Sequence, residues 1–311
     1  MTNANKLWLG IGCGLLAGAF WGLVFLAPEL AFDFTPLQLA AGRYLAYGAF
    51  ALALIAPRWR RLATHVGRRE WLALTGLSLL GNTLYYVLLA FAVQKGGVAM
   101  TSVVIGFLPV AVTTIGSFDH GAVRLRRLAP ALALGAAGVA CIAWESLMGA
   151  GGEAHPQSAI GLLCAVGALA SWTAYAVLNG RWLARLEHIS AADWSLLTGV
   201  ATGAQALVLA AAAVAIGLGE HSAAAWGRFL AVSAGVAIFA SIIGNALWNR
   251  ASRLLPMTLV GQMIVFETLF ALLYGFLWEA RGPTALETAA IVLMIASVLS
   301  CVSAHRAERL A

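Results

Sequence analysis

The 311-residue chain is 61% hydrophobic and only 10% charged, with a mean hydropathy of +0.87. A soluble domain of this length needs far more polar surface, so these values exclude a soluble enzyme or nucleic-acid-binding domain. The four cysteines lie inside apolar runs without the spacing of metal ligands. Neither a disulfide framework nor a metal or other cofactor is therefore expected.

Apolar runs of about 20 residues, the length that crosses the hydrocarbon core of a bilayer as a helix, recur along the chain. Because the runs are continuous rather than alternating, they predict an all-α integral membrane protein with ten transmembrane helices, surrounded by membrane lipid. The expected spans are 7–27, 36–56, 71–91, 97–117, 128–145, 158–183, 194–218, 226–248, 256–278 and 283–303. Pro109 lies inside the fourth span, where it predicts a bend and a hinge.

The charged residues predict the orientation of the spans. With the N-terminus in the cytoplasm, fifteen of the nineteen Lys and Arg residues fall on the cytoplasmic side, and only Lys95, Arg228 and Arg281 fall outside. This asymmetry follows the positive-inside rule and predicts that both termini are cytoplasmic. It also explains the net charge of +6 without a nucleic-acid partner. The segments near Glu153 and Glu220 are expected to face outward.

Tryptophans near predicted span ends, Trp194 among them, suit a role as interfacial anchors. Trp21 in the first span and Trp172 in the sixth lie deeper, in similar surroundings. Five spans separate them, so spans 1–5 (residues 1–147) and 6–10 (residues 148–311) are predicted to be two repeats. An odd number of helices per repeat gives the repeats inverted topology.

Matching polar positions support this duplication. Gly81-Asn82 and Gly244-Asn245 each lie near the end of an apolar run. A second run follows each pair, and it carries Pro109 in the first half and Glu267 in the second. The sequence therefore predicts a transporter whose site lies where the halves meet.

The order of several motifs resembles the drug/metabolite transporter superfamily, in particular its ten-span EamA-type members. The motifs are Phe20-Trp21-Gly22, Ser171-Trp172-Thr173, Gly42-Arg43-Tyr44, Leu108-Pro109-Val110, and Phe266-Glu267-Thr268 followed by Glu279. The resemblance implies a cavity between spans 1, 3, 4, 6, 8 and 9, and export by alternating access. Trp21, Trp172 and Tyr175 are similar to the aromatic amino-acid exporters, whereas Gly106 and Leu108 depart from that pattern.

Glu267 is the acidic side chain expected at mid-membrane depth, and Arg43 is a basic residue inside the second predicted span. A carboxylate near mid-membrane costs several kcal/mol, so Glu267 is a site candidate by default. The alternative is a protonated Glu267 that braces a neighbouring helix. Arg43 lies about two turns into its span and is expected either to snorkel to the outer face or to pair with a substrate carboxylate.

The remaining substrate-binding candidates are polar or aromatic. Asn82, Asn245 and Gln262 either line the cavity or cement helix packing. Tyr175, Trp248 and one of the adjacent Tyr85 and Tyr86, with Tyr86 preferred, are expected to form aromatic walls. Trp248 could instead anchor the chain at the interface.

The predicted function is export of small metabolites, amino acids above all, across a bacterial inner membrane. All six histidines are assigned to loops or tails, and no two acids share the membrane interior, so an enzyme is not expected. The alternatives are a membrane-embedded enzyme or a carrier of drugs or nucleotide sugars with the same fold. A monomer is expected, with a homodimer as the alternative.

Overall fold

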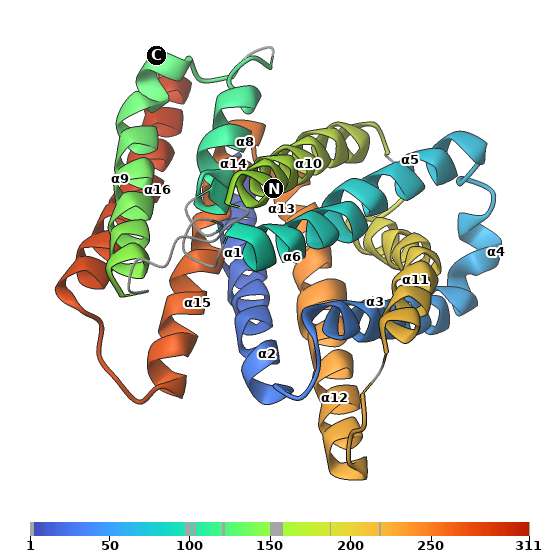
Figure 1. Cartoon of the computed structure of the whole chain (residues 1–311). Coiled ribbons are helices and arrows are strands. Elements are labelled where there is room, and N and C mark those ends of the chain that lie inside the picture. Colours follow the sequence, from blue (N-terminus) through green and yellow to red (C-terminus); the bar gives the residue numbers. More distant parts are fainter. Residues whose placement is uncertain are drawn as a thin grey trace.

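The computed structural model describes residues 3–96, 101, 104–119, 122–149, 158–186, 188–217 and 219–310. These residues form helices and turns without a strand (Figure 1). Nine helical stretches in the described ranges are long and apolar enough to cross a membrane, and Val104–Gly116 is a shorter apolar helix. The all-α membrane fold with ten helical spans is thus confirmed.

The helices of the first half follow the expected spans closely. They are α1 (Asn3–Gly22), the 3-10 turn η1 (Leu23–Leu26), α2 (Ala27–Leu30), α3 (Pro36–Ile55), η2 (Ala56–Arg58), α4 (Trp59–Leu62), α5 (Arg68–Ser78), η3 (Leu79–Thr83), α6 (Leu84–Gly96), α8 (Leu108–Gly116) and α9 (Leu125–Gly149). Thr35 caps the start of α3, and its side chain forms a capping box with Gln38. Pro36 occupies the first turn of the helix, where a missing N–H costs little. The expected beginning of the fourth span, 97–100, lies outside the described residues.

The helices of the second half are α10 (Ser158–Arg185), α11 (Ala191–Ile216), α12 (Ala223–Val236), η4 (Ala237–Gly244), α13 (Asn245–Leu254), α14 (Met257–Met263), α15 (Val265–Trp278) and α16 (Ala285–Leu310). Two ends differ from the expectation. α13 continues past Trp248 to Leu254, and α16 runs to Leu310, so His305 is a buried helical residue rather than part of a tail.

Two spans contain π-helical segments at related positions. In the third span η3 ends directly after Gly81-Asn82, and in the eighth span η4 ends at Gly244, directly before Asn245. Gly81 leaves room for the Tyr175 ring, since a Cβ there would lie 2.5 Å from the ring, and Gly244 likewise borders Trp21. π-helical turns are often found at functional sites.

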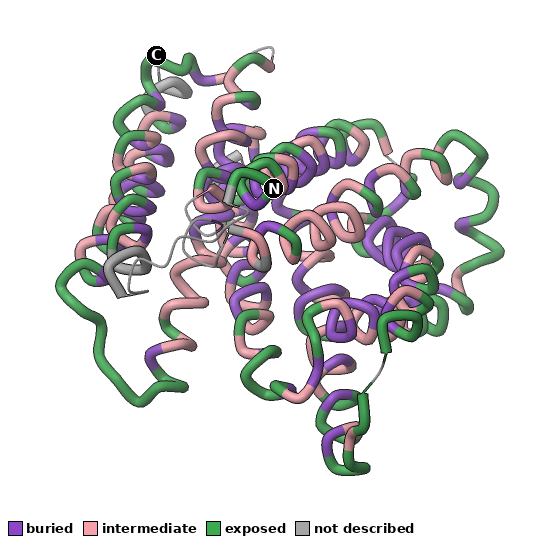
Figure 2. The backbone as a smooth tube through the Cα atoms, viewed as in Figure 1, coloured by how far each residue is buried: buried purple, intermediate pink, exposed green. Residues whose placement is uncertain are grey.

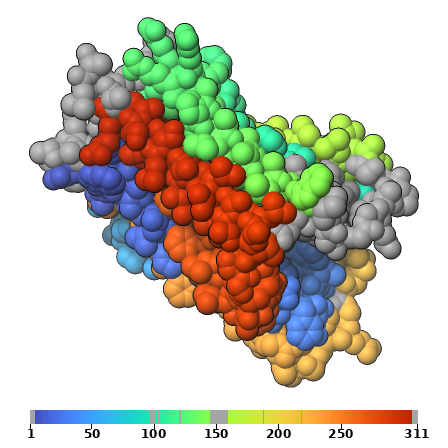
Figure 3. Space-filling model, turned by 90° about the vertical axis from the view of Figure 1, so that its left-hand side faces the viewer, coloured from blue at the N-terminus to red at the C-terminus, as the bar shows by residue number. Residues whose placement is uncertain are grey.

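Helices of the two halves pack against each other throughout the structure. α3 lies along α11, α6 along α10, α8 along α14, and α1 along α13 and α15. α9 and α16 form a pair that lies side by side on one face (Figure 3). Gly135 and Gly138 of α9 face α16, so these small residues allow close packing between the two helices. The inverted repeat and its boundary at residues 147/148 stay predictions with which this pairing agrees.

Burial follows the helix contacts, and the exposed residues lie on the outward sides of the helices (Figure 2). Many of the exposed residues have large apolar side chains. Leu163, Val208 and Leu277 are 73%, 70% and 69% exposed. Such a surface suits lipid rather than water. Trp194, expected as an interfacial anchor, is instead fully buried, and its indole N–H donates to Asn179 Oδ1 at 2.9 Å.

Candidate substrate-binding site

A cavity of about 480 Å³ lies among α6, α9, α15 and the segment that leads into α8. Tyr85, Pro109 and Glu267 line it, with Phe25 from the first span and Met294 from the tenth. It extends along α15 to Glu279 and Arg281 at the end of that helix. The cavity therefore borders spans 1, 3, 4 and 9, as the family resemblance implied, but spans 5 and 10 in place of 6 and 8.

Glu267 occupies the middle of the Met257–Trp278 span and faces this cavity. It follows an interruption of the ninth span at Ile264, where α14 ends and α15 begins. Within the described part of the chain, its carboxyl group has neither a hydrogen-bond partner nor an ion-pair partner. A half-buried carboxyl group at membrane depth without a protein partner is available to a ligand.

The glycines of α1 allow α14 and α15 to approach closely. Added Cβ atoms at Gly14, Gly18 and Gly22 would lie within 2.9 Å of Met263, Phe266 and Phe270 respectively. The same Cβ at Gly18 would lie 2.8 Å from the Glu267 backbone nitrogen. This line of glycines positions Glu267 but was not singled out from the sequence, although its four-residue spacing is visible there.

Trp21, Trp172, Trp248 and Tyr175 form a closed aromatic cluster, and all four are buried. The ring centroids of Trp21 and Trp248 lie 5.1 Å apart, those of Trp172 and Trp248 5.8 Å, and those of Trp172 and Tyr175 5.8 Å. Trp248 is 1% exposed and therefore belongs to this cluster, not to an interfacial belt. Because the cluster fills the space beside spans 6 and 8, the cavity does not reach those spans.

The two adjacent tyrosines lie in different places. Tyr85 lines the large cavity, whereas Tyr86, the residue preferred from the sequence, lines a smaller pocket together with Arg43. The Tyr86 hydroxyl donates to the Pro36 carbonyl at 3.0 Å. Arg43 does not extend simply to the surface, since its Nε donates to Ser241 Oγ of η4 at 3.1 Å.

The two asparagines hold helices together in this conformation. Asn82 Nδ2 donates to Thr202 Oγ1 of α11 at 3.1 Å. Asn245 Oδ1 accepts from Trp21 Nε1 at 3.2 Å, and the same indole N–H also reaches the Ala240 carbonyl at 3.1 Å. Direct contact of either asparagine with substrate stays a prediction.

Gln262 is also used between helices. Its Nε2 donates to Thr113 Oγ1 at 3.2 Å, its Oε1 accepts from Ser297 Oγ at 2.9 Å, and it is 1% exposed. It is absent from the described lining of both cavities, so a substrate contact would require another conformation. Pro109 lies at the start of α8, directly after an interruption at Phe107, and its role as a hinge stays a prediction.

Comparisons with known proteins agree with this architecture. The model of the EamA-like transporter family matches residues 8–144. The Inner membrane protein YtfF of Escherichia coli (strain K12) is 31% identical over an alignment 316 residues long that covers 95% of each chain. A protein of known crystal structure shares the fold with a TM-score of 0.70 at 19% identity, over 98% of this chain and 100% of that one. The chain therefore belongs to the EamA-like transporter family of the drug/metabolite transporter superfamily, whose members are membrane transporters of small metabolites.

Proposed function

We propose that the protein exports amino acids and related compounds, aromatic ones included, across a bacterial inner membrane by alternating access. The observation that carries this proposal is Glu267, a carboxyl group at mid-span that faces a cavity without a partner among the described residues. An ionised carboxylate attracts the ammonium group of an amino acid, and a protonated one donates a hydrogen bond. Either state gives Glu267 a role in recognition.

The surroundings of Glu267 support a small and partly apolar substrate. A volume of about 480 Å³ lies within the range of small-molecule sites. Tyr85, Phe25 and Phe276 line the cavity beside aliphatic side chains. Aromatic rings give a flat apolar surface to a substrate side chain, while Glu267 would hold its polar end.

The arrangement supports alternating access because one end of the site is open and the other is closed. The cavity reaches Glu279 and Arg281 at the end of α15. Beyond the aromatic cluster, Asn179 Nδ2 donates to Asn249 Oδ1 at 2.9 Å, and Arg58 pairs with Asp193 at 2.7 Å. These contacts would have to separate when substrate enters from the other side. We include Arg43, Asn82, Tyr86, Trp21, Trp172, Tyr175, Asn245, Trp248 and Gln262 as residues that contact substrate in one state of the cycle, and Pro109 as the hinge.

The orientation is part of the proposal. We expect segments near Arg60, Arg126 and Arg253 to face the cytoplasm, and those near Asp33 and Glu220 to face outward. Glu153, expected outside as well, lies beyond the described residues. In a background without the four native cysteines, single cysteines at these positions should react with an impermeant reagent from opposite sides. Labelling of the Arg126 and Glu220 positions from the same side would contradict the orientation.

The experiment that tests the function uses purified protein in liposomes. A broad panel of amino acids is loaded on one side, and efflux is followed at two pH values. Saturable, protein-dependent flux of one or more amino acids supports the proposal, and its pH dependence shows whether protons take part. Flux of other metabolites with none of any amino acid would contradict the proposed substrate class.

A further inference from the structure

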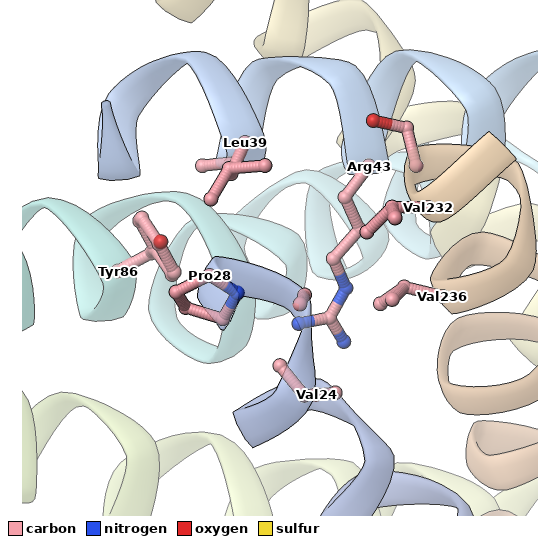
Figure 4. Close-up of a pocket in the computed structure, with 10 residues that line it drawn as sticks. Val24, Pro28, Leu39, Arg43, Tyr86, Val232 and Val236 are labelled. Atoms are coloured by element: carbon pink, nitrogen blue, oxygen red, sulfur yellow. The ribbon is translucent and has the colours of Figure 1, made fainter. Parts of the chain in front are cut away.

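A second pocket of about 40 Å³ lies between the end of the first span and the beginning of the second, at the side of α12. Val24 and Pro28 border it from η1 and α2, Leu39 and Arg43 from α3, and Val232 from α12. Figure 4 shows the Arg43 guanidinium pointing into this space toward Pro28 and Val24. The pocket shares no lining residue with the large cavity.

Arg43 is a cation without an acidic side chain at ion-pair distance in the described part of the chain, and Glu267 interacts with it electrostatically from farther away. Its Nε is occupied by Ser241 Oγ at 3.1 Å, and the guanidinium lies 5.2 Å from the centre of the Tyr44 ring. The N–H groups on its two terminal nitrogens have no hydrogen-bond partner among the described residues. A guanidinium in a transmembrane span normally pairs with an anion or with backbone carbonyls, so this arrangement calls for an acceptor.

Ser233 adds a second, independent sign of a ligand. This residue lines the same pocket, is 4% exposed, and its hydroxyl has no hydrogen-bond partner among the described residues. A buried hydroxyl without a partner is costly, and such groups in native proteins usually have a bound water, ion or ligand. Apart from Tyr86, whose hydroxyl already donates to the Pro36 carbonyl, the remaining walls are aliphatic. A low local dielectric constant strengthens the attraction between Arg43 and an anion.

We propose that Arg43 and Ser233 form a binding site for one small monovalent anion, either a free halide or the carboxylate group of a metabolite. The size of the pocket argues for this class, because about 40 Å³ corresponds to only a few water-sized positions and excludes a whole amino acid. Arg43 supplies the charge, and Ser233, whose hydroxyl is sealed against Gly42 in this conformation, would supply a donor after rotation of its side chain toward the pocket. Arg43 is also one of the residues proposed to contact substrate, but the anion site is tested separately from export, since binding is measured without transport.

The test uses the purified full-length protein in lipid nanodiscs with the salt of a bulky sulfonate at constant ionic strength. Chloride, bromide or acetate replaces the sulfonate in steps, and the thermal unfolding midpoint is measured. Ligand binding to the folded state should raise the midpoint saturably, by about 2 °C or more. A response to halides indicates a free inorganic ion and a response to acetate alone indicates a carboxylate group; both support the site. No saturable response to any of the three overturns it.

Variants link the response to the pocket. Arg43→Gln should abolish the anion-dependent shift, and Ser233→Ala should weaken the apparent affinity severalfold. The matched control is Arg228→Gln. Arg228 lies on α12, the helix that carries Ser233, and it already pairs with Asp33 at 2.6 Å. Loss of Arg228 should therefore leave the anion-dependent shift unchanged. An unchanged shift in Arg43→Gln overturns the proposal.

A measurement on the unaltered protein covers the case in which Arg43→Gln does not fold. Crystals of the wild-type protein grown with bromide, at a concentration that saturates the thermal shift, are examined by anomalous scattering. A peak beside the Arg43 guanidinium supports the site. Saturation by bromide without a peak there places the bound ion elsewhere and overturns the assignment.

Discussion

The aromatic cluster and the Glu267 cavity lie on neighbouring parts of the same helices but differ in packing. Trp21, Trp172 and Trp248 are buried against one another, with ring centroids 5.1–6.2 Å apart. Glu267 instead faces about 480 Å³ of space. Both regions contain residues that the sequence assigned to one substrate site, and this conformation closes one region while it opens the other. The difference suggests that the cluster works as a closed gate and the cavity as the binding chamber.

The largest expected effect comes from Glu267→Gln, which keeps the shape of the side chain but removes its ability to ionise. We expect efflux from liposomes to fall by about tenfold or more, equivalent to about 1.4 kcal/mol, because no other acid lines the middle of the described cavity wall. The remaining flux should no longer change with pH over the range in which wild-type flux does.

Glu279→Gln is the matched control for this substitution. Glu279 lies at the end of the same cavity but forms an ion pair with Arg281, so we expect less than a twofold change in efflux. Normal, pH-dependent efflux by Glu267→Gln would remove Glu267 from the mechanism. The search for a polar anchor would then move to Asn82 and Asn245.

The boundaries of most spans could be predicted because apolar length and capping chemistry are local. The helix type inside the spans could not be predicted, because a continuous apolar run carries no signal for its hydrogen-bond register. The π-helical segment Leu79–Thr83 shows the consequence. One extra residue in a turn rotates everything after it by about 100°, which shifts the residue that faces a given neighbour. This explains why Tyr85, rather than Tyr86, lines the large cavity.

The positions of charged and aromatic residues were predictable only where one dominant force decides them. Glu267 was found because burial of a carboxyl group at mid-membrane is costly. Trp194 was misassigned because its hydrogen-bond partner Asn179 lies on another helix. The sequence near the span end gives no sign of this contact. His305 was misassigned because its buried position depends on Thr258, whose hydroxyl lies 2.6 Å from His305 Nε2.

The next largest effect is expected from Trp172→Ala in the closed cluster. Removal of this ring should lower efflux about fivefold and destabilise the protein by about 3 kcal/mol, because large-to-small changes in packed interiors leave a cavity. Trp172→Phe should retain most of both. Trp194→Phe is the comparison outside the cluster, and it should lower the thermal midpoint without changing efflux. Equal efflux in wild type and Trp172→Ala for every substrate would make the cluster a packing element only.

A smaller effect should separate the two tyrosines. Tyr85→Ala enlarges the large cavity, so we expect the KM for efflux to change about threefold with little change in stability. Tyr86→Ala alters the Arg43 pocket and the hydrogen bond to Pro36, and the KM should stay within twofold of wild type. A KM change confined to Tyr86→Ala would place substrate in the smaller pocket and reverse the assignment.

The smallest effect on transport is expected at Gln262. In this conformation it braces the fourth and tenth spans through Thr113 and Ser297. Both partners keep another hydrogen bond when the amide is lost, since Thr113 Oγ1 also donates to the Thr258 carbonyl and Ser297 Oγ to the Ala131 carbonyl. Gln262→Leu should therefore cost only about 1 kcal/mol of stability and leave efflux within twofold, whereas Gln262→Ala should cost more because it also removes buried volume. A severalfold rise in KM for Gln262→Leu at unchanged stability would instead show that the amide meets substrate in another state of the cycle, and would extend the binding chamber beyond the space next to Glu267.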